Sequence, residues 1–387
     1  MGRPLRALLA GCGGISRAWV NPAKDMPGLE IAGLVDIKRE AAEALAEQHG
    51  LEGAVIETDL EVALDRVKPD VLFNCTVPEA HLSVSLAAVR RGIHVLCEKP
   101  LADSMDHART LVEAAREAKV VYAVMQNRRY DPNIRKVRAL LASGALGRVT
   151  TVDVDFFIGA HFGGFRDHMK HVLLVDMAIH TLDQARCLSR TDPVSVIAHE
   201  WNPPGSWYDH DASAVACYEM TGGAVLTYRG SWCAEALNTT WEGDWRIGCE
   251  RGSLRWDGAG AIRASRVSKT GGFHSEWADV EVPDAGEPDK ANGHGGCLAE
   301  FVRCVREGGV PETEAADNLK SLAMVFGAIA GGRDRPPRPH LLLTQRYRTF
   351  SFRQSSGRSM TSVQSENVST DPANLGRART RGSRIVA

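Results

Sequence analysis

The chain has 387 residues and a formal net charge of −2, so its 46 basic and 48 acidic side chains leave no charge excess for binding nucleic acid or an anionic membrane. No apolar stretch is long enough to span a membrane, and the length exceeds what one hydrophobic core usually serves, so we expect two domains. The nine cysteines are scattered without a Cys-X-X-Cys pair, which favours reduced thiols in the cytoplasm over a disulfide framework or a zinc ribbon.

Strands and helices alternate over the first third of the chain. Short apolar runs predict buried strands at Leu5–Ala10, Ile31–Val35, Val71–Cys75, His94–Cys97 and Val120–Met125. Between them the sequence predicts helices at Glu40–His49, His81–Arg90 and Ser104–Ala118. This alternation is typical of an α/β domain with a parallel sheet and helices on both faces, so residues 1–126 are predicted to form a nucleotide-binding Rossmann domain.

The pattern changes after residue 126. Helices predicted at Asn133–Ser143 and Val172–Leu188 flank an alternating strand at Val149–Ile158. Further strands are predicted at Val194–Glu200, Ala212–Glu219, Ala224–Trp232, Trp245–Cys249, Ser253–Trp256 and Val280–Val282, with hairpin turns at Thr221–Gly223 and Glu250–Gly252. We expect residues 127–332 to form an α+β domain whose open, mostly antiparallel sheet is closed by two helices, Gly296–Arg306 and Glu314–Ala330.

Residues 333–387 differ in amino-acid composition from both domains. They begin with a proline-rich break and are then rich in Ser and Arg and poor in large apolar side chains. Such a segment buries too little surface to offset the entropy of ordering, so the sequence predicts a disordered tail.

A glycine-rich turn, Gly11-Cys12-Gly13-Gly14-Ile15-Ser16, follows the first strand and precedes a predicted helix. Gly11 permits a tight turn, and Gly13 lets the backbone approach a pyrophosphate at the helix N-terminus. Asp36 ends the second strand, where a carboxylate binds the hydroxyls of the adenosine ribose, so the pattern favours NAD. Lys38 and Arg39 lie near enough in sequence to bind a 2′-phosphate, which leaves NADP open.

Two further segments end strands at the edge of the sheet where ligands bind. One is Asn74-Cys75-Thr76-Val77-Pro78, followed by His81, and the other is Glu98-Lys99-Pro100. Lys99 faces the predicted crevice, where its ammonium would hydrogen-bond a substrate hydroxyl or stabilise a developing alkoxide. Besides the glycine turn and Asp36, the residues expected to contact the cofactor are Thr76, Pro78, His81, Glu98, Lys99 and Gln126.

The helix predicted at Val172–Leu188 is almost wholly apolar apart from one polar stripe. Asp176 and His180 are four residues apart and share a face, and Asp183 lies on the same stripe. Buried polar groups need partners or a ligand. Two interpretations stay open: a satisfied internal Asp–His pair, or a catalytic arrangement in which His180 is a general base at neutral pH.

Three histidines, His161, His168 and His171, lie just before this helix. Their spacing with Asp176 and His180 matches no standard ligand set, so we expect no metal, and His161 and His168 are candidates for lining a substrate pocket. Seven of the eight tryptophans come after residue 200. They are expected either in the sheet core and a dimer interface or as a platform for a sugar ring.

Together these segments resemble the Gfo/Idh/MocA oxidoreductase family over nearly all of Leu5–Ala330. The resemblance rests on the glycine turn, on Asp36, on Thr76-Val77-Pro78 with His81, on Glu98-Lys99-Pro100, on Asn127-Arg128-Arg129-Tyr130-Asp131-Pro132 and on the Asp-X-X-X-His helix. The Glu-Lys-Pro triplet combined with that helix is the most specific part. Two departures are Ser16, in place of the usual third glycine or alanine, and the sequence after Ala330.

The resemblance implies a Rossmann domain followed by a domain for substrate binding and oligomerisation, in a homodimer or homotetramer. It implies reversible hydride transfer between a sugar or polyol hydroxyl, as in inositol, and the nicotinamide of NAD or NADP. The residue matching Lys99 then contacts the reacting hydroxyl, the one matching His180 is the general base or acid, and the one matching Asp176 orients the substrate. The lysine–proline peptide is often cis in the family, and Arg128 and His294 are expected to reach the substrate.

Two other functions fit the same residues. An NAD-dependent glycosidase would oxidise, eliminate and re-reduce its substrate without net production of NADH. A non-catalytic sensor would bind NAD(P) and a partner protein, although the presence of Lys99, Asp176 and His180 argues against it.

Overall fold

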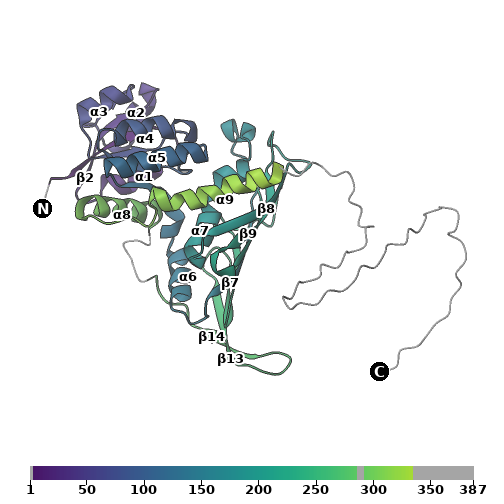
Figure 1. Ribbon diagram of the computed structural model, residues 1–387. Coiled ribbons are helices and arrows are strands. Elements are labelled where there is room, and N and C mark those ends of the chain that lie inside the picture. Colours follow the sequence, from purple (N-terminus) through teal and green to yellow (C-terminus); the bar gives the residue numbers. More distant parts are fainter. Residues whose placement is uncertain (1–2, 286–291, 334–387) are drawn as a thin grey trace, which may run out of the picture. The chain divides into compact units, whose positions relative to one another are not determined.

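The computed structural model describes residues 3–285 and 292–333, so the predicted tail, apart from Arg333, lies outside the described residues (Figure 1). The N-terminal part is a six-stranded parallel sheet of order β3-β2-β1-β4-β5-β6, as expected for a Rossmann domain. The strands are β1 (Leu5–Ala10), β2 (Leu29–Val35), β3 (Val55–Glu57), β4 (Val71–Asn74), β5 (His94–Cys97) and β6 (Tyr122–Val124). The helices between them are α1 (Ser16–Lys24), α2 (Arg39–His49), α3 (Leu60–Val67), α4 (His81–Val89) and α5 (Met105–Ala118).

Two of these elements, β3 and α3, are missing from the sequence analysis. β3 has only three residues, all half-buried, so it shows no apolar run. α3 begins where the side chain of Asp59 accepts a hydrogen bond from the Val62 amide, a normal N-cap. The direction of strand progression reverses between β1 and β4, and in such sheets ligands bind beyond the carboxyl ends of the strands at this point.

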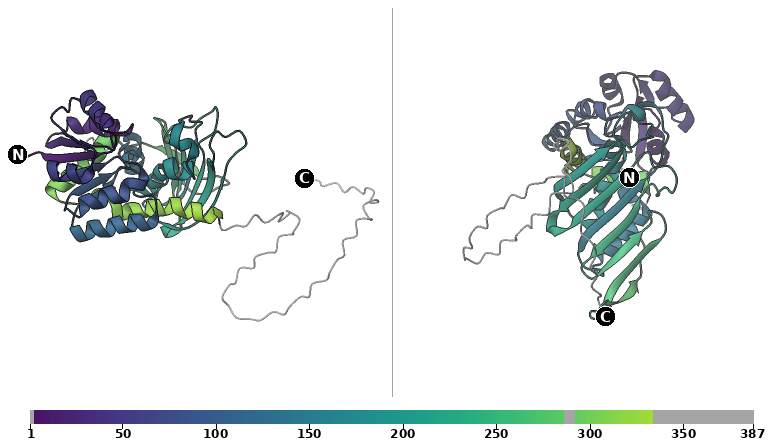
Figure 2. Two further views of the ribbon diagram at one scale, coloured as in Figure 1. Left: turned by 90° about the horizontal axis from the view of Figure 1, so that it is seen from above. Right: turned by 90° about the vertical axis from the view of Figure 1, so that its right-hand side faces the viewer.

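The second part is an eight-stranded sheet of order β14-β13-β12-β11-β7-β10-β9-β8, seen in the right-hand view of Figure 2. All neighbouring pairs are antiparallel except β7 with β10, which confirms the predicted open, mostly antiparallel sheet. Its strands are β7 (Val149–Phe157), β8 (Pro193–Trp201), β9 (Ser213–Met220), β10 (Val225–Ser231), β11 (Asp244–Cys249), β12 (Gly252–Trp256), β13 (Ile262–Lys269) and β14 (Glu276–Val280).

The edge of this sheet differs from the sequence prediction. No strand was expected at Ile262–Lys269, and the strand placed at Val280–Val282 lies instead at Glu276–Val280. The reason is exposure: β14 and the end of β13 have little buried surface, so no apolar pattern marks them. In β9, by contrast, alternate residues are buried and exposed, and the prediction there is nearly right.

The helical layer begins with α6 (Pro132–Ala142) and continues through the segment expected as one α-helix at Val172–Leu188. That expectation is wrong in part: Leu173–Ala178 forms a π-helical segment, η4, and only Ile179–Ser189 is the α-helix α7. A π-helical segment has wider turns than an α-helix and is frequent at functional sites. Asp176 therefore lies in η4 and His180 in the first turn of α7.

The last two helices pack on different sheets. α8 (Gly293–Glu307) packs on α1 and β5, and its Phe301 contacts Phe73 of β4, so it covers the Rossmann sheet instead of closing the second sheet as expected. α9 (Ala315–Arg333) packs on β8, as expected, and also on α5 and α7 (Figure 1). No helix in the described part of the chain, the 19-residue α9 included, is long and apolar enough to cross a membrane.

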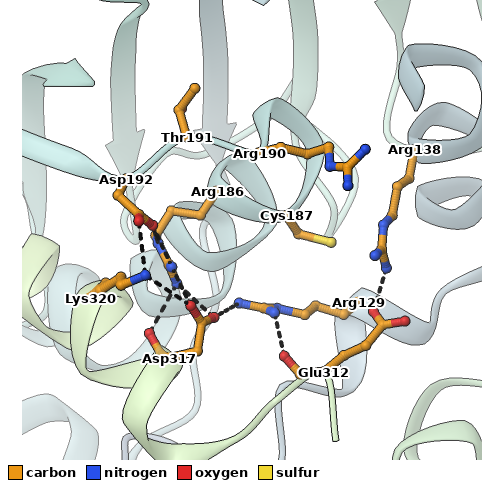
Figure 3. A pocket seen from close by; sticks show the side chains of 10 residues that line it. All are labelled: Arg129, Arg138, Arg186, Cys187, Arg190, Thr191, Asp192, Glu312, Asp317 and Lys320. Carbon is orange, nitrogen blue, oxygen red and sulfur yellow. Dashed lines mark hydrogen bonds and ion pairs between the residues drawn. The ribbon is translucent and has the colours of Figure 1, made fainter. Parts of the chain in front are cut away.

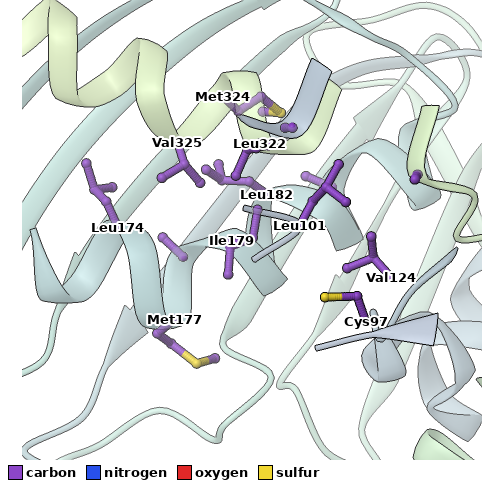
Figure 4. Close-up of a cluster of buried hydrophobic side chains, with 14 of the residues drawn as sticks. Cys97, Leu101, Val124, Leu174, Met177, Ile179, Leu182, Leu322, Met324 and Val325 are labelled. Carbon is purple, nitrogen blue, oxygen red and sulfur yellow. The ribbon is translucent and has the colours of Figure 1, made fainter. Parts of the chain in front are cut away.

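Buried apolar side chains from both parts form one continuous cluster (Figure 4). Cys97, Leu101 and Val124 come from the Rossmann domain, and they lie in the same cluster as Leu182 of α7 and Leu322 of α9. A shared close-packed core leaves little freedom between the elements that form it. It therefore holds α7 at a fixed position against the strand ends of the parallel sheet.

Candidate active site

The glycine turn lies between the carboxyl end of β1 and the first turn of α1, where the sequence predicts it. Gly11 has φ of 90°, and a Cβ there would lie 2.7 Å from the carbonyl carbon of Cys75, so only glycine fits. A Cβ on Gly13 or Gly14 would meet nothing within 4 Å, so this backbone faces open space. Ser16 is buried and donates from Oγ to the carbonyl of Gly13 at 2.6 Å, which closes the turn without the usual third glycine.

Asp36, at the end of β2, binds the turn directly. Its Oδ2 accepts from the amide of Cys12 at 2.7 Å and its Oδ1 from the amide of Lys38 at 2.9 Å. The carboxylate thus stands where it would meet the hydroxyls of an adenosine ribose. Arg39, a candidate for a 2′-phosphate, lies 3.4 Å from the carboxylate of Glu43 instead.

The residues after β4 and β6 complete the predicted cofactor side. Thr76 donates from Oγ1 to Oδ1 of Asn74 at 2.6 Å, and Pro78 begins the short 3-10 helix η1 (Pro78–Ala80). Both polar atoms of the Gln126 side chain are buried without a hydrogen-bond partner in the described part of the chain. A buried amide in this state is costly unless a ligand satisfies it, so Gln126 and the open glycine turn together fit a bound dinucleotide.

His81 and Glu98 hold the segment that carries Lys99. The two ring nitrogens of His81 lie 2.8 Å from the carbonyl of Pro100 and 3.1 Å from a carbonyl of the loop after β4. Glu98 accepts from the indole of Trp19 and from the Lys99 amide, both at 2.8 Å. Burial raises the pKa of Glu98 in spite of the nearby Lys99 charge. Both side chains are therefore engaged with protein groups around Lys99, and their contact with the cofactor stays a prediction.

Lys99 reaches from the end of β5 to η4, and its peptide with Pro100 is cis, as the resemblance implies. Its Nζ donates to the carbonyl of Asp176 at 2.6 Å and lies 3.3 Å from Oδ1 of the same residue. Arg166 donates from Nε to Oδ2 at 2.8 Å. Burial alone would raise the pKa of Asp176, but the charges of Lys99 and Arg166 outweigh burial and lower it. Asp176 is thus a half-buried, ionised carboxylate between two cations.

His180 lies one turn beyond Asp176, in α7. It is buried, and its Nδ1 has no hydrogen-bond partner among the described residues. The alternative of a satisfied internal Asp–His pair is therefore wrong, because Asp176 pairs with cations and not with His180. Burial lowers the pKa of His180 well below its usual value, and the charges of Lys99 and Arg128 lower it further. The imidazole is neutral at pH 7 and able to accept a proton.

The 3-10 helix η2 (Asn127–Tyr130) and the start of α8 bring two more predicted residues to His180. Arg128 binds Oε1 of Glu242 at 2.5 Å, and Nδ2 of Asn127 lies 3.4 Å from Nδ1 of His294. Burial, together with the Arg128 charge, lowers the pKa of His294 to about 4. A second neutral imidazole therefore lies near the first, although the two belong to helices that are distant in the chain.

The remaining predicted histidines are engaged separately. Each lies against its own carboxylate: His161 against Glu235 at 2.7 Å, His168 against Asp209 at 2.6 Å and His171 against Glu200 at 2.8 Å. In residues 3–285 and 292–333 no three His, Cys, Asp or Glu side chains gather as a metal ion would require. The structure therefore does not join these three histidines to Asp176 and His180 in one group.

Asp183 is also engaged elsewhere, which corrects the expectation of a single polar stripe with Asp176 and His180. Its carboxylate accepts from Arg129 at 2.6 and 2.7 Å and from the hydroxyl of Ser321 at 2.6 Å. A buried guanidinium requires such a partner. Arg129 also borders a pocket of about 280 Å³ together with Arg186 and Asp317 (Figure 3). This network ties η2 to α7 and α9, and so holds the neighbouring Arg128 and His180 in place.

Arg166 and Glu242 hold Asp176 and Arg128, and neither is predicted from the sequence. Arg166 lies in the short 3-10 helix η3 (Gly164–His168) and Glu242 in the turn before β11, two segments for which the sequence predicts no element. Charge complementarity is the available signal, because a half-buried Asp176 and a half-buried Arg128 are each stabilised by an opposite charge. The sequence does not say which of many surface charges supplies it.

The comparison with known proteins matches both parts of the chain. Residues 5–126 match a family described as "Oxidoreductase family, NAD-binding Rossmann fold", and residues 134–255 match the "GFO/IDH/MocA C-terminal domain". The chain belongs to the Gfo/Idh/MocA oxidoreductase family. It is thus an NAD(P)-binding oxidoreductase, and its named relatives include enzymes of sugars and polyols.

Two relatives of known name align with most of the chain. The chain is 32% identical over 326 residues to the 1,5-anhydro-D-fructose reductase of Ensifer adhaerens, covering 83% of this chain and 94% of that protein. It is 29% identical over 331 residues to the inositol 2-dehydrogenase of Streptomyces avermitilis, covering 81% and 90% of the two chains. Among solved structures, an oxidoreductase from Agrobacterium radiobacter in complex with NAD+, L-tartaric acid and magnesium has a TM-score of 0.75 at 21% identity, covering 85% and 96%. That likeness shows the shared fold.

Proposed function

We propose that the protein transfers a hydride between the hydroxyl-bearing carbon of a sugar or polyol and the nicotinamide of NAD. The observation that carries the proposal is the meeting of Lys99, Asp176 and the unpartnered His180 at the carboxyl end of the parallel sheet. An ammonium, an ionised carboxylate and a neutral imidazole are the groups that bind a hydroxyl and accept its proton.

The cofactor would lie along the crevice at the strand ends. The backbone of Gly11–Ser16 would hold the pyrophosphate and Asp36 the adenosine ribose, with Thr76 and Gln126 on the other side of the crevice. When bound, NAD supplies the acceptor for the hydride. Because Arg39 lies against Glu43 and Asp36 carries a negative charge toward the ribose, we propose NAD over NADP.

The protein's own residues would handle the proton and the charge. His180 would take the hydroxyl proton, which its lowered pKa allows because the ring is unprotonated at neutral pH. Lys99 would stabilise the negative charge that develops on the oxygen. Asp176 holds the Lys99 ammonium in place and would orient neighbouring hydroxyls of the substrate, with Arg128 and His294 at the edge of the pocket.

The named relatives support this class of substrate. One is named a 1,5-anhydro-D-fructose reductase and another an inositol 2-dehydrogenase, so both names describe redox chemistry at a ring carbon that carries oxygen. A further relative is named a D-glucoside 3-dehydrogenase, at 29% identity over 245 residues. We therefore propose a cyclic sugar or inositol-like polyol as the substrate.

We also propose the division into a cofactor domain, residues 1–126, and a substrate domain, residues 127–332, with assembly into a homodimer or homotetramer. The open face of the second sheet supports assembly, because Ile197, Val215 and Val225 on three adjacent strands are exposed apolar side chains. The nine cysteines are all free thiols, which supports a cytoplasmic location.

The test is an activity screen of the full-length protein with sugars and polyols and with NAD or NADP, followed by NADH or NADPH absorbance. We expect turnover with NAD, and Lys99→Ala should lower kcat by about 100-fold or more because the charge on the oxygen loses its partner. The affinity for NAD should stay within about threefold. Lys269→Ala, an exposed lysine of β13, is the control. Wild-type turnover in Lys99→Ala, or no reduced cofactor with any substrate, contradicts the proposal.

A further inference from the structure

Three aromatic side chains from two loops gather beside the proposed catalytic residues, and we call Phe162, Phe165 and Trp241 the aromatic rim. The ring centroids of Phe162 and Trp241 are 6.2 Å apart, and these rings lie 5.5 and 5.7 Å from that of Trp232 beneath them. Trp232 is buried, but Phe162, Phe165 and Trp241 are 47%, 61% and 48% exposed. A cluster of exposed aromatic side chains on a folded protein often marks a binding site.

The aromatic rim is tied to both sides of the active site. The guanidinium of Arg166 lies 4.9 Å from the ring of Phe162 and 4.7 Å from that of Phe165, while its Nε binds Asp176 at 2.8 Å. On the other side, the backbone carbonyl of Trp241 accepts a hydrogen bond from Arg128, whose charge lowers the pKa of His180. A single residue on each side, Arg166 or Arg128, therefore lies between the exposed rings and the groups that would hold the reacting hydroxyl.

Two carboxylates, each paired with a histidine, lie against the segment that carries Phe162 and Phe165. Glu235 lies against His161, whose ring stacks on Trp207 with centroids 3.7 Å apart, and Asp209 lies against His168. Both carboxylates are largely exposed. Carboxylates accept hydrogen bonds from hydroxyl groups and repel a phosphate or a second carboxylate. The nearby cations Arg166 and Arg128 are already paired with Asp176 and Glu242, so the surroundings favour a ring that carries hydroxyls and no negative charge.

We propose that the aromatic rim is a second subsite, which takes the second ring of a neutral glycoside while the first ring is oxidised at Lys99 and His180. This inference rests on the proposed function. The apolar face of a pyranose ring would lie on Trp241 and Phe162, and its hydroxyls would reach Glu235 or Asp209. The substrate class is then a disaccharide or other glycoside in preference to a free monosaccharide.

The experiment compares cellobiose, maltose and lactose with glucose and galactose, as substrates and as ligands of the NAD-loaded protein. We expect a disaccharide to exceed its monosaccharides in kcat/KM by about tenfold, the order that one aromatic contact with its buried area provides. Trp241→Ala should abolish this preference while the monosaccharide value stays within about threefold. Trp277→Ala, which removes a 67% exposed tryptophan on β14, should leave the preference unchanged.

Binding measured by calorimetry separates this inference from the proposed function. Disaccharide binding that depends on Trp241, without NADH from any sugar, supports the subsite and contradicts the hydride transfer. Turnover of monosaccharides and disaccharides at equal kcat/KM overturns the subsite and leaves the hydride transfer intact. A higher kcat/KM for UDP-glucose than for cellobiose also overturns the subsite. So does a Trp241→Ala variant that loses kcat/KM equally for monosaccharides and disaccharides.

Discussion

The cofactor end of the proposed active site is built largely from backbone, whereas the substrate end is built from charged side chains that hold one another. At the cofactor end, the open turn at Gly11–Ser16 needs only one carboxylate, Asp36, beside it. At the substrate end, Lys99, Asp176 and Arg166 come from three segments and form a single charged group. Substitutions that disturb the backbone of the turn should lower NAD affinity, whereas substitutions in the charged group should lower kcat. The two ends should therefore separate cofactor binding from turnover.

The largest effect is expected at His180. His180→Gln should lower kcat by a factor of about 10² to 10⁴, the usual contribution of a general base, because glutamine accepts no proton. NAD affinity should change by less than about threefold, since His180 belongs to the substrate end. Steady-state kinetics and NAD titration measure both values. The control is His107→Gln, in α5 beside Asp103, and a parallel loss of NAD affinity in His180→Gln would erase the distinction between the two ends.

The converse pattern is expected for Gly11→Ala. The substitution forces a side chain to φ of 90° and into the backbone after β4, so NAD affinity should fall by about tenfold or more. Gly92→Ala is a matched control, since Gly92 has φ of 72° and a Cβ there meets nothing within 4 Å. It should lose only the roughly 1–2 kcal/mol of backbone strain, seen in the melting temperature, and keep its NAD affinity. Equal NAD affinities in the two variants would refute this use of the turn.

A smaller effect is expected at Asp36. Asp36→Ser removes the charge that would face the ribose, and hydrogen bonds to a charged group contribute about 1.5–3 kcal/mol. The kcat/KM for NAD should fall by about tenfold, that for NADP should rise, and kcat at saturating NAD should stay near the wild-type value. Initial rates with both cofactors check this. A fall in saturated kcat as large as the fall in kcat/KM would show that Asp36 acts beyond the cofactor end.

The smallest effect on activity is expected behind the substrate end. Arg186 lowers the pKa of Asp317 to about 2 in spite of burial, and Arg135 and Arg138 do the same for Glu312. Because the folded-state pKa values lie below the unfolded values of about 4, this stability is fully present above pH 4 and is lost as the pH falls toward 2. Melting temperatures from pH 5 to 2 should fall more steeply in the wild type than in Asp317→Asn. Parallel curves would show that Asp317 does not contribute to the loss of stability at low pH.

Much of the cofactor end is predictable because its signals are local. The turn at Gly11–Ser16, the acid at Asp36 and the strand before Lys99 lie within short windows of sequence, and the structure places them where the pattern puts them. The departure at Ser16 has a local reason as well, since its hydroxyl bonds within the turn.

The substrate end is less predictable because its contacts join distant segments. The spacing of Asp176 and His180 marks them as a polar pair, but only the fold shows that Asp176 pairs with Lys99 and Arg166 and leaves His180 without a partner. The π-helical segment η4 has no signal in an apolar run, and Asp183 shares the helix while it serves the separate Arg129 network.

The most direct measurement is to follow deuterium from the substrate. A sugar or polyol that the screen identifies would be labelled at the reacting carbon and incubated with the protein and NAD. We expect the label at the nicotinamide ring of NADH, in amounts equal to the oxidised product, and we expect Lys99→Ala to slow its arrival by about 100-fold or more. Label that returns to the sugar or exchanges into water without net NADH would contradict it.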